Sequence, residues 1–137
     1  MSSVRQLPIP EDLEREIDLE TARRGASWSE IAVELLDEAI RMRRVPGIMF
    51  VDGPAGRRAA VVGTGLDVWE IIGTFKEVDQ DLVRLRRAYD WLTEPQLQSA
   101  LRYYELYPEK IDDRLVREAS WTLDRVRAEL PFTRVQS

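Results

Sequence analysis

The stretch from Gly63 to Pro108 constrains the fold most, because it places three short helical patterns between tight connections. Each pattern has its own start signal, in which an Asp or Thr side chain can satisfy free backbone N–H groups of the first turn. These signals are Asp67 with Glu70, Asp79, and Thr93 with Gln96. Pro108 is expected to end the third helix. The pattern predicts a small trihelical domain of the helix-turn-helix type.

Apolar residues at helical spacing identify the expected core of this stretch. They are Val68, Trp69, Ile71, Ile72 and Phe75 in the first helix, Leu82, Val83, Leu85 and Tyr89 in the second, and Leu97, Ala100, Leu101 and Tyr104 in the third. A single-strand platform of Trp91, Tyr103, Tyr104 and Tyr107 is the alternative use of the aromatic side chains. Helical spacing favours core and interface roles for them.

Residues 1–45 are predicted to form a strand and two helices. Residues 4–9 alternate weakly, Pro10 opens a helix, and Gly25 ends it. Ser27 and Glu30 form a capping box for the second helix, whose apolar stripe continues to Ile40. Two helices cannot bury so rich a stripe, so it forms either part of a larger bundle or a dimer core.

Strand, helix, short Gly-containing turn and helix resemble the ribbon-helix-helix fold of many antitoxins and small repressors. The resemblance implies a dimer whose paired strands enter the DNA major groove. The candidate dimer core consists of Leu7, Ile9, Trp28, Ile31, Leu35 and Leu36. Arg5 and Gln6 would contact DNA from the ribbon, and Ser27 and Ser29 would hold a phosphate at a helix N-terminus.

Residues 46–108 combine a predicted β-hairpin with the trihelical domain. Two apolar runs flank the turn Asp52–Gly56, a pattern typical of a hairpin. Residues 109–137 are predicted to form a long amphipathic helix and a tail. Its apolar stripe is Ile111, Leu115, Ala119, Leu123, Val126 and Leu130.

The segments PGIMF, GTGLDVWEII and LTEPQLQSALRYYELYPEKID lie between Pro46 and Asp112. They resemble domain-of-unknown-function family 433, which is linked to VapB-type antitoxins. The resemblance implies an antitoxin that neutralises a small toxin, often a PIN-like ribonuclease, and represses its own operon. The candidate DNA contacts of the third helix are Gln96, Gln98, Ser99 and Arg102, and helical spacing places the last three on one exposed side. From the antitoxin class, the candidate toxin contacts are Arg114, Arg117, Arg125 and Arg127.

Composition limits the chemistry that the chain can perform. It has no histidine and no cysteine, which removes the commonest metal ligand, the usual general base and thiolate sites. Neither glycine-rich turn has phosphate-loop spacing. Two carboxylate pairs, Asp79 with Asp81 and Asp112 with Asp113, are interpreted as helix caps and helix starts. We therefore expect no catalytic, metal or cofactor site and no small-molecule ligand.

The expected partners are a second copy of the chain in a dimer or higher oligomer, a cognate toxin and operator DNA. The alternative is a protein-interaction or scaffold module, or a transcriptional regulator without a toxin. The net charge of −5 and Pro8 in the ribbon favour that alternative. No apolar run approaches the roughly 18 residues of a membrane span, and no signal-peptide pattern opens the chain. We therefore expect a cytoplasmic protein.

Overall fold

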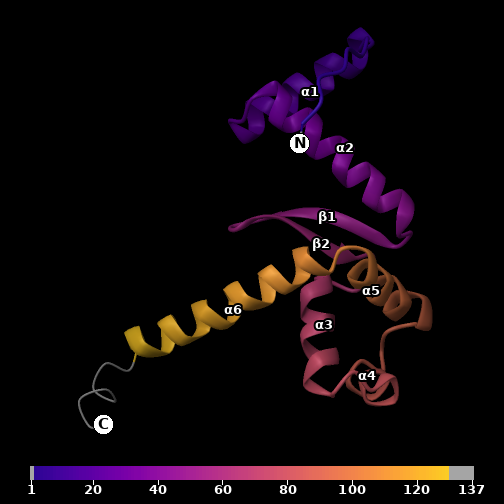
Figure 1. Cartoon of the computed structure of the whole chain (residues 1–137), viewed down its shortest axis with the longest axis vertical. Helices are drawn as coiled ribbons and strands as arrows, with labels where there is room; N and C mark the ends of the chain where they lie inside the picture. Colours follow the sequence, from indigo (N-terminus) through magenta and orange to yellow (C-terminus); the bar gives the residue numbers. More distant parts are fainter. Residues whose placement is uncertain (1, 130–137) are drawn as a thin grey trace. The chain divides into compact units, whose positions relative to one another are not determined.

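The computed structural model of the protein describes residues 2–129 and is mainly helical (Figure 1). Between these residues it has six helices and one two-stranded antiparallel hairpin. The prediction of a mainly α fold with short β structure is therefore confirmed. The chain divides into two compact units, residues 1–43 and residues 44–137. Each unit is described by itself.

The first unit contains α1 (Glu11–Arg24) and most of α2 (Trp28–Arg44). Acidic residues occupy the first turn of α1, where they complement the positive end of the helix dipole. Gly25 ends α1 in the left-handed conformation with φ 64°, and its N–H donates to the Thr21 carbonyl at 2.8 Å. Ser27 Oγ accepts from Glu30 N at 3.1 Å at the start of α2. The predicted connection of two helices through Gly25 is thus present.

The predicted strand at residues 4–9 is absent from this single chain. Residues 2–10 form neither helix nor strand. A short strand needs the backbone groups of a neighbour, and the two strands that the structure does describe pair with each other. The alternating sequence pattern cannot by itself supply the missing partner.

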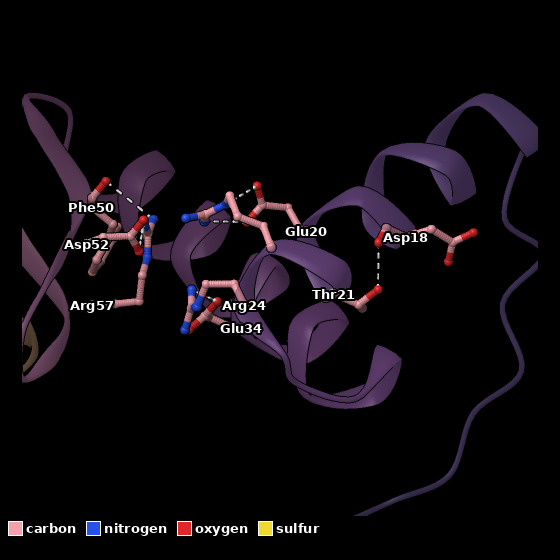
Figure 2. A network of polar contacts seen from close by, with 9 residues as sticks. Asp18, Glu20, Thr21, Arg24, Glu34, Phe50, Asp52 and Arg57 are labelled. Atoms are coloured by element: carbon pink, nitrogen blue, oxygen red, sulfur yellow. Dashed lines mark hydrogen bonds and ion pairs between the residues drawn. The ribbon is translucent and has the colours of Figure 1, made fainter.

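The second unit begins with the hairpin of β1 (Ile48–Gly53) and β2 (Gly56–Val61). Ile48 pairs with Val61, and Gly53 pairs with Gly56 at the turn. The predicted hairpin is therefore confirmed. Arg57 adds side-chain support at the turn end, donating to Asp52 Oδ1 at 3.0 Å and to the Phe50 carbonyl at 3.3 Å (Figure 2).

Four helices follow: α3 (Val68–Glu77), α4 (Leu82–Ala88), α5 (Glu94–Leu106) and α6 (Pro108–Glu129). The predicted capping boxes at Asp67 with Glu70 and at Thr93 with Gln96 are both present. α3 contacts β2, α4, α5 and α6, and is thus the central element of the unit. None of the helices between residues 2 and 129 is long and apolar enough to cross a membrane.

The core of the second unit forms where the hairpin and the helices meet. Val68, Ile71, Ile72, Leu85 and Ala100 are completely buried. Complete burial of a valine, leucine or isoleucine side chain stabilises a fold by about 1.5–3 kcal/mol. The predicted positions on α3 and α5 therefore include most of the central core.

The predicted core is wrong at several positions. On α4 only Leu85 is buried, whereas Leu82 and Val83 are exposed, because this short helix presents a single residue to α3. On α5 the fully buried tyrosine is Tyr103 rather than Tyr104. The Tyr103 ring packs against the rings of Phe50 and Tyr107, with centroid distances of 6.4 and 5.0 Å. The hairpin therefore selects which tyrosine turns inward.

Two predicted helix boundaries also need correction. Asp81, not Asp79, caps α4, since its side chain accepts from Val83 N and Arg84 N. Asp79 and Gln80 instead turn the chain with φ values of 56° and 60°. Pro108 follows the end of α5, as predicted, but it is also the first residue of α6. Proline suits that position, where its missing N–H needs no partner.

Gln80→Gly is expected to raise the free energy of unfolding by about 0.5–1 kcal/mol, because glycine adopts a left-handed conformation without steric cost. Urea unfolding measures the change. The control Gln98→Gly lies in a helix at negative φ and should lower stability by about 1 kcal/mol. A loss of stability in Gln80→Gly would contradict the expectation.

Candidate interaction surfaces

The first unit carries an unburied apolar surface. Its buried apolar side chains are Ile17 and Ile31, while Leu7, Leu36 and Ile40 are each more than half exposed. Nine residues line one hollow of about 410 Å³, which we call the apolar hollow: Arg5, Leu7, Ile9, Leu13, Ile17, Trp28, Ala32, Leu35 and Leu36. The structure thus brings together five of the six predicted dimer-core residues, and the sixth, Ile31, is 2% exposed.

A partly buried ion pair joins the two helices that contribute to this hollow. Arg24, at the end of α1, donates two hydrogen bonds of 3.0 Å to the carboxylate of Glu34 on α2 (Figure 2). Both side chains are about one quarter exposed. A bidentate pair of planar groups restricts relative rotation more than a single contact does. The pair therefore supports the angle at which α1 and α2 present their apolar side chains.

The N-terminal DNA-contact candidates lie on the surface of the first unit. Arg5 and Gln6 are exposed, and Arg5 also lines the apolar hollow. Ser27 and Ser29 are exposed at the start of α2, where Ser27 Oγ accepts from the Glu30 amide. Ser27 thus has a structural role as a helix cap, whereas Ser29 lies in the first turn.

The four candidates on α5 make contacts within the second unit. The Gln96 side chain accepts from Thr93 N at 2.9 Å, and Gln98 donates to Glu94 at 3.1 Å. Ser99 Oγ donates to the carbonyls of Pro46 and Pro95, at 2.8 and 3.0 Å. Arg102 pairs with Glu105 at 3.2 Å.

The position of Ser99 requires a glycine at residue 47. A Cβ at Gly47 would lie only 2.6 Å from Ser99 Oγ, and Gly47 has φ 97°. Ser99 therefore fastens α5 to the segment that leads into the hairpin. Gln96 and Ser99 stabilise local structure, while Gln98 and Arg102 remain exposed beside their acidic neighbours.

The candidate toxin-contact arginines differ in their surroundings. Arg114 donates to Glu118 at 2.7 Å and lies over the Trp69 ring at 5.1 Å, which fixes it against α3. Arg125 lies over the Trp121 ring at 5.3 Å. Arg117 and Arg127 are exposed. Arg114 is therefore part of the packing between α3 and α6, and the other three lie farther along α6.

The apolar stripe of α6 starts in the core and continues onto the surface. Ile111 is 5% exposed and Leu115 packs against the core, whereas Leu123 is 59% exposed. Figure 1 shows that the yellow part of α6 extends beyond α3 and α5. Leu130 lies outside the described residues, as does the side chain of Val126. α6 thus offers apolar side chains that the second unit does not bury.

A polar cluster that the sequence interpretation missed joins three helices. Asp112 Oδ1 accepts from Lys76 Nζ at 3.0 Å and from Tyr104 Oη at 2.8 Å. The hydrogen bond from Lys76, followed by that from Tyr104, lowers the pKa of Asp112. The three residues lie on α3, α5 and α6, so no local sequence pattern marks them. Tyr104 is used for this hydrogen bond, which explains its half-buried position.

A second charged contact joins α4 to α5. Arg86 donates to Glu94 at 2.9 and 2.7 Å, and Gln98 donates to the same carboxylate. Hydrogen bonds from Arg86 and then Gln98 lower the pKa of Glu94 to about 2. Both side chains of the ion pair are about half exposed, so the contact orients the helices more than it stabilises them.

The two carboxylate pairs considered from the sequence take part in helix structure. Asp81 caps α4, and Asp112 belongs to the cluster with Lys76 and Tyr104. Asp79 is exposed and lies 3.6 Å from Arg84. Among residues 2–129, no three acidic side chains gather closely enough to hold a metal ion.

Comparisons with known proteins identify no related protein. A scan against models of protein families finds no matching family, and searches of curated proteins and of solved structures find no match. The function is therefore argued from the surfaces of the chain.

Acid should weaken the contact between α4 and α5. The pKa of Glu94 is lowered in the folded state from its ordinary value of 4.5, so its contribution to stability is complete above pH 4.5 and is lost as the pH falls toward 2. Glu94→Gln should therefore lose stability less steeply than the parent protein between pH 4.5 and 2. Urea unfolding midpoints at successive pH values measure the slopes, with Glu109→Gln as control. Equal slopes in Glu94→Gln and the parent would contradict the assignment.

The apolar hollow predicts self-association. Leu36→Glu should raise the dissociation constant of a dimer roughly a hundredfold or more, because it introduces an unpaired carboxylate into an apolar interface. Sedimentation equilibrium gives the constant. Leu82→Glu, an equivalent change at an exposed leucine of α4, should leave it unchanged. A monomeric parent protein, or equal effects of both changes, would rule out this interface.

Proposed function

We propose that the chain is a non-enzymatic antitoxin of a type II toxin-antitoxin system. It dimerises, binds operator DNA to repress its own operon, and neutralises a small PIN-like ribonuclease by direct binding. The apolar hollow carries the proposal, because five predicted dimer-core residues meet there and four of them, Leu7, Trp28, Leu35 and Leu36, are exposed in the single chain. Such a surface marks a protein that works by association.

A ribbon-helix-helix dimer explains the first unit economically. In the dimer, residues 4–9 of each chain pair as a two-stranded ribbon, which supplies the strand partner that one chain lacks. Leu7 and Ile9 then cover Trp28, Leu35 and Leu36 of the joined helices. Gln6 lies on the opposite face of the ribbon, within reach of base edges, and Arg5 lies near the ribbon's edge, where it can reach phosphates.

The proposed DNA contact is better supported for the ribbon than for α5. A trihelical domain of the helix-turn-helix type would use α5 as its recognition helix. Gln96 and Ser99 already hold the start of α5 and the segment around Pro46. Releasing them for DNA would leave those backbone groups unpaired. We therefore assign the second unit mainly to support and partner binding.

Toxin binding is assigned to the part of α6 beyond the core. Arg117, Arg125 and Arg127 lie on this part of α6 and are the candidates for contact with the acidic metal site of a nuclease. Exposed Trp121 and Leu123 add the apolar area that a stable complex requires. Arg114 is less suited, because it is committed to Glu118 and Trp69.

A scaffold module without DNA binding is the second candidate. The net charge of −5 favours it, as does Pro8, which lacks an N–H for ribbon pairing. The two candidates share dimerisation and protein binding through α6. They differ in whether the ribbon contacts DNA, and that difference can be measured.

The test combines a mobility shift on the chain's own promoter with co-purification of the product of the neighbouring reading frame. We expect DNA affinity to fall steeply as salt rises, and to fall roughly tenfold in Arg5→Ala from lost phosphate contacts. Arg117→Ala is the matched control on DNA and should instead weaken the protein complex. Weak DNA binding that does not respond to salt, with an intact protein complex, would favour the scaffold. Absence of both would reject the proposal.

A further inference from the structure

An open groove of about 520 Å³ lies between one face of α3 and one face of α6, within the second unit. We call it the α3–α6 groove. We propose that it binds a basic amphipathic helix of a partner protein, with apolar side chains on its floor and lysine or arginine at its carboxylates. The proposal goes beyond the proposed function and does not require it, because a scaffold could use the same groove.

The floor of the groove is apolar and closely packed. Gly73 of α3 lies against Leu115 of α6, and a Cβ added at Gly73 would be 3.3 Å from Leu115 Cδ2. Ala119 follows Leu115 by one helical turn and also lines the groove. Gly73 lets Leu115 of α6 approach α3 closely, and the small side chain of the exposed Ala119 leaves the surface beside it open to the ridge of a third helix. The floor therefore has the form of a helix-binding site.

The polar lining of the groove is acidic. Three carboxylates line it, those of Glu70, Glu77 and Glu118, and no Lys or Arg belongs to the lining between residues 2 and 129. Glu70 accepts from Asp67 N, and Glu118 accepts from Arg114. Glu77 is exposed and makes no ion pair or hydrogen bond with any described side chain. Because Arg114 offsets the charge of Glu118, the carboxylates of Glu70 and Glu77 give the groove its negative charge, which favours a basic protein segment over nucleic acid.

The apolar lining is continuous with the exposed stripe of α6. Leu123 follows Ala119 by one helical turn and is 59% exposed. A helix lying in the groove would extend along Leu123 and bury it. One partner segment therefore accounts for both the acidic groove and this uncovered apolar side chain.

The test uses the full chain and two labelled peptides. Each peptide has about 18 residues, which is about five turns of an α-helix. Both place leucine at positions i, i+3, i+4 and i+7. One carries lysine at all other positions and the second carries glutamate. The lysine peptide should bind, and the glutamate peptide should not. Fluorescence anisotropy at physiological salt gives both affinities.

Two groove variants locate the binding site. Glu77→Lys and Thr122→Arg should each weaken binding of the lysine peptide roughly tenfold or more by charge repulsion. Thr122 lines the groove, and its hydroxyl donates to the Glu118 carbonyl within α6. Thermal unfolding confirms that each variant remains folded. Glu109→Lys, an equal charge change outside the groove, and Leu36→Glu, in the apolar hollow, should leave the affinity unchanged.

Four outcomes overturn the proposal: no binding of the lysine peptide, equal binding of the glutamate peptide, equal weakening by Glu109→Lys, or loss of binding in Leu36→Glu. Sedimentation equilibrium tests a further occupant. A lower mass for Glu77→Lys than for the parent would assign the groove to a second copy of the chain and would also overturn it. Because the peptides require neither toxin nor operator, failure here leaves the antitoxin proposal to its own test.

Discussion

The contacts of Asp67 determine how the second unit is assembled. Asp67 is 7% exposed and joins Glu70 in the capping box that starts α3. Its carboxylate accepts from Trp69 Nε1 at 3.0 Å and lies 3.3 Å from Arg58 Nε on β2, an ion pair without hydrogen-bond alignment. Its backbone also bridges to Ala60. One buried carboxylate thus starts the central helix and attaches it to the hairpin, and α4, α5 and α6 then pack against α3. Removing it would leave buried donors without an acceptor.

The two units satisfy their apolar residues in different ways. The second unit closes a core around Ile71, Ile72 and Tyr103, and leaves apolar side chains exposed mainly along α6 and α4. The first unit has only two helices and an extended segment, so Leu36 and its neighbours have no cover within that unit. Exposed apolar area of this kind favours association, since burial in an interface removes it from water. The proposed dimer and the proposed partner helix would therefore each bury apolar area that one chain leaves exposed, at two different surfaces.

Local signals predicted the elements well, and long-range contacts explain the errors. Capping residues at Asp67 and Thr93 act within one helical turn, so their effect is visible in sequence. Asp79 and Asp81 have the same side chain two positions apart, and only the left-handed turn between α3 and α4 decides which one caps α4. For the candidate site, five of the nine residues that line the apolar hollow are ones that the sequence marked as dimer-core candidates. It did not predict that Gln96, Ser99 and Arg114 are used in structural contacts.

The amino-acid sequence by itself determined the helices, the hairpin and the absence of imidazole and thiol chemistry, because capping, turn and composition rules act over a few residues. Tertiary structure alone decided that Tyr103 turns inward, and that Lys76, Tyr104 and Asp112 meet from three helices. It also decided that Glu77 lines an acidic groove beside Gly73. These features depend on distances between residues far apart in the chain, which periodicity and local propensity do not specify.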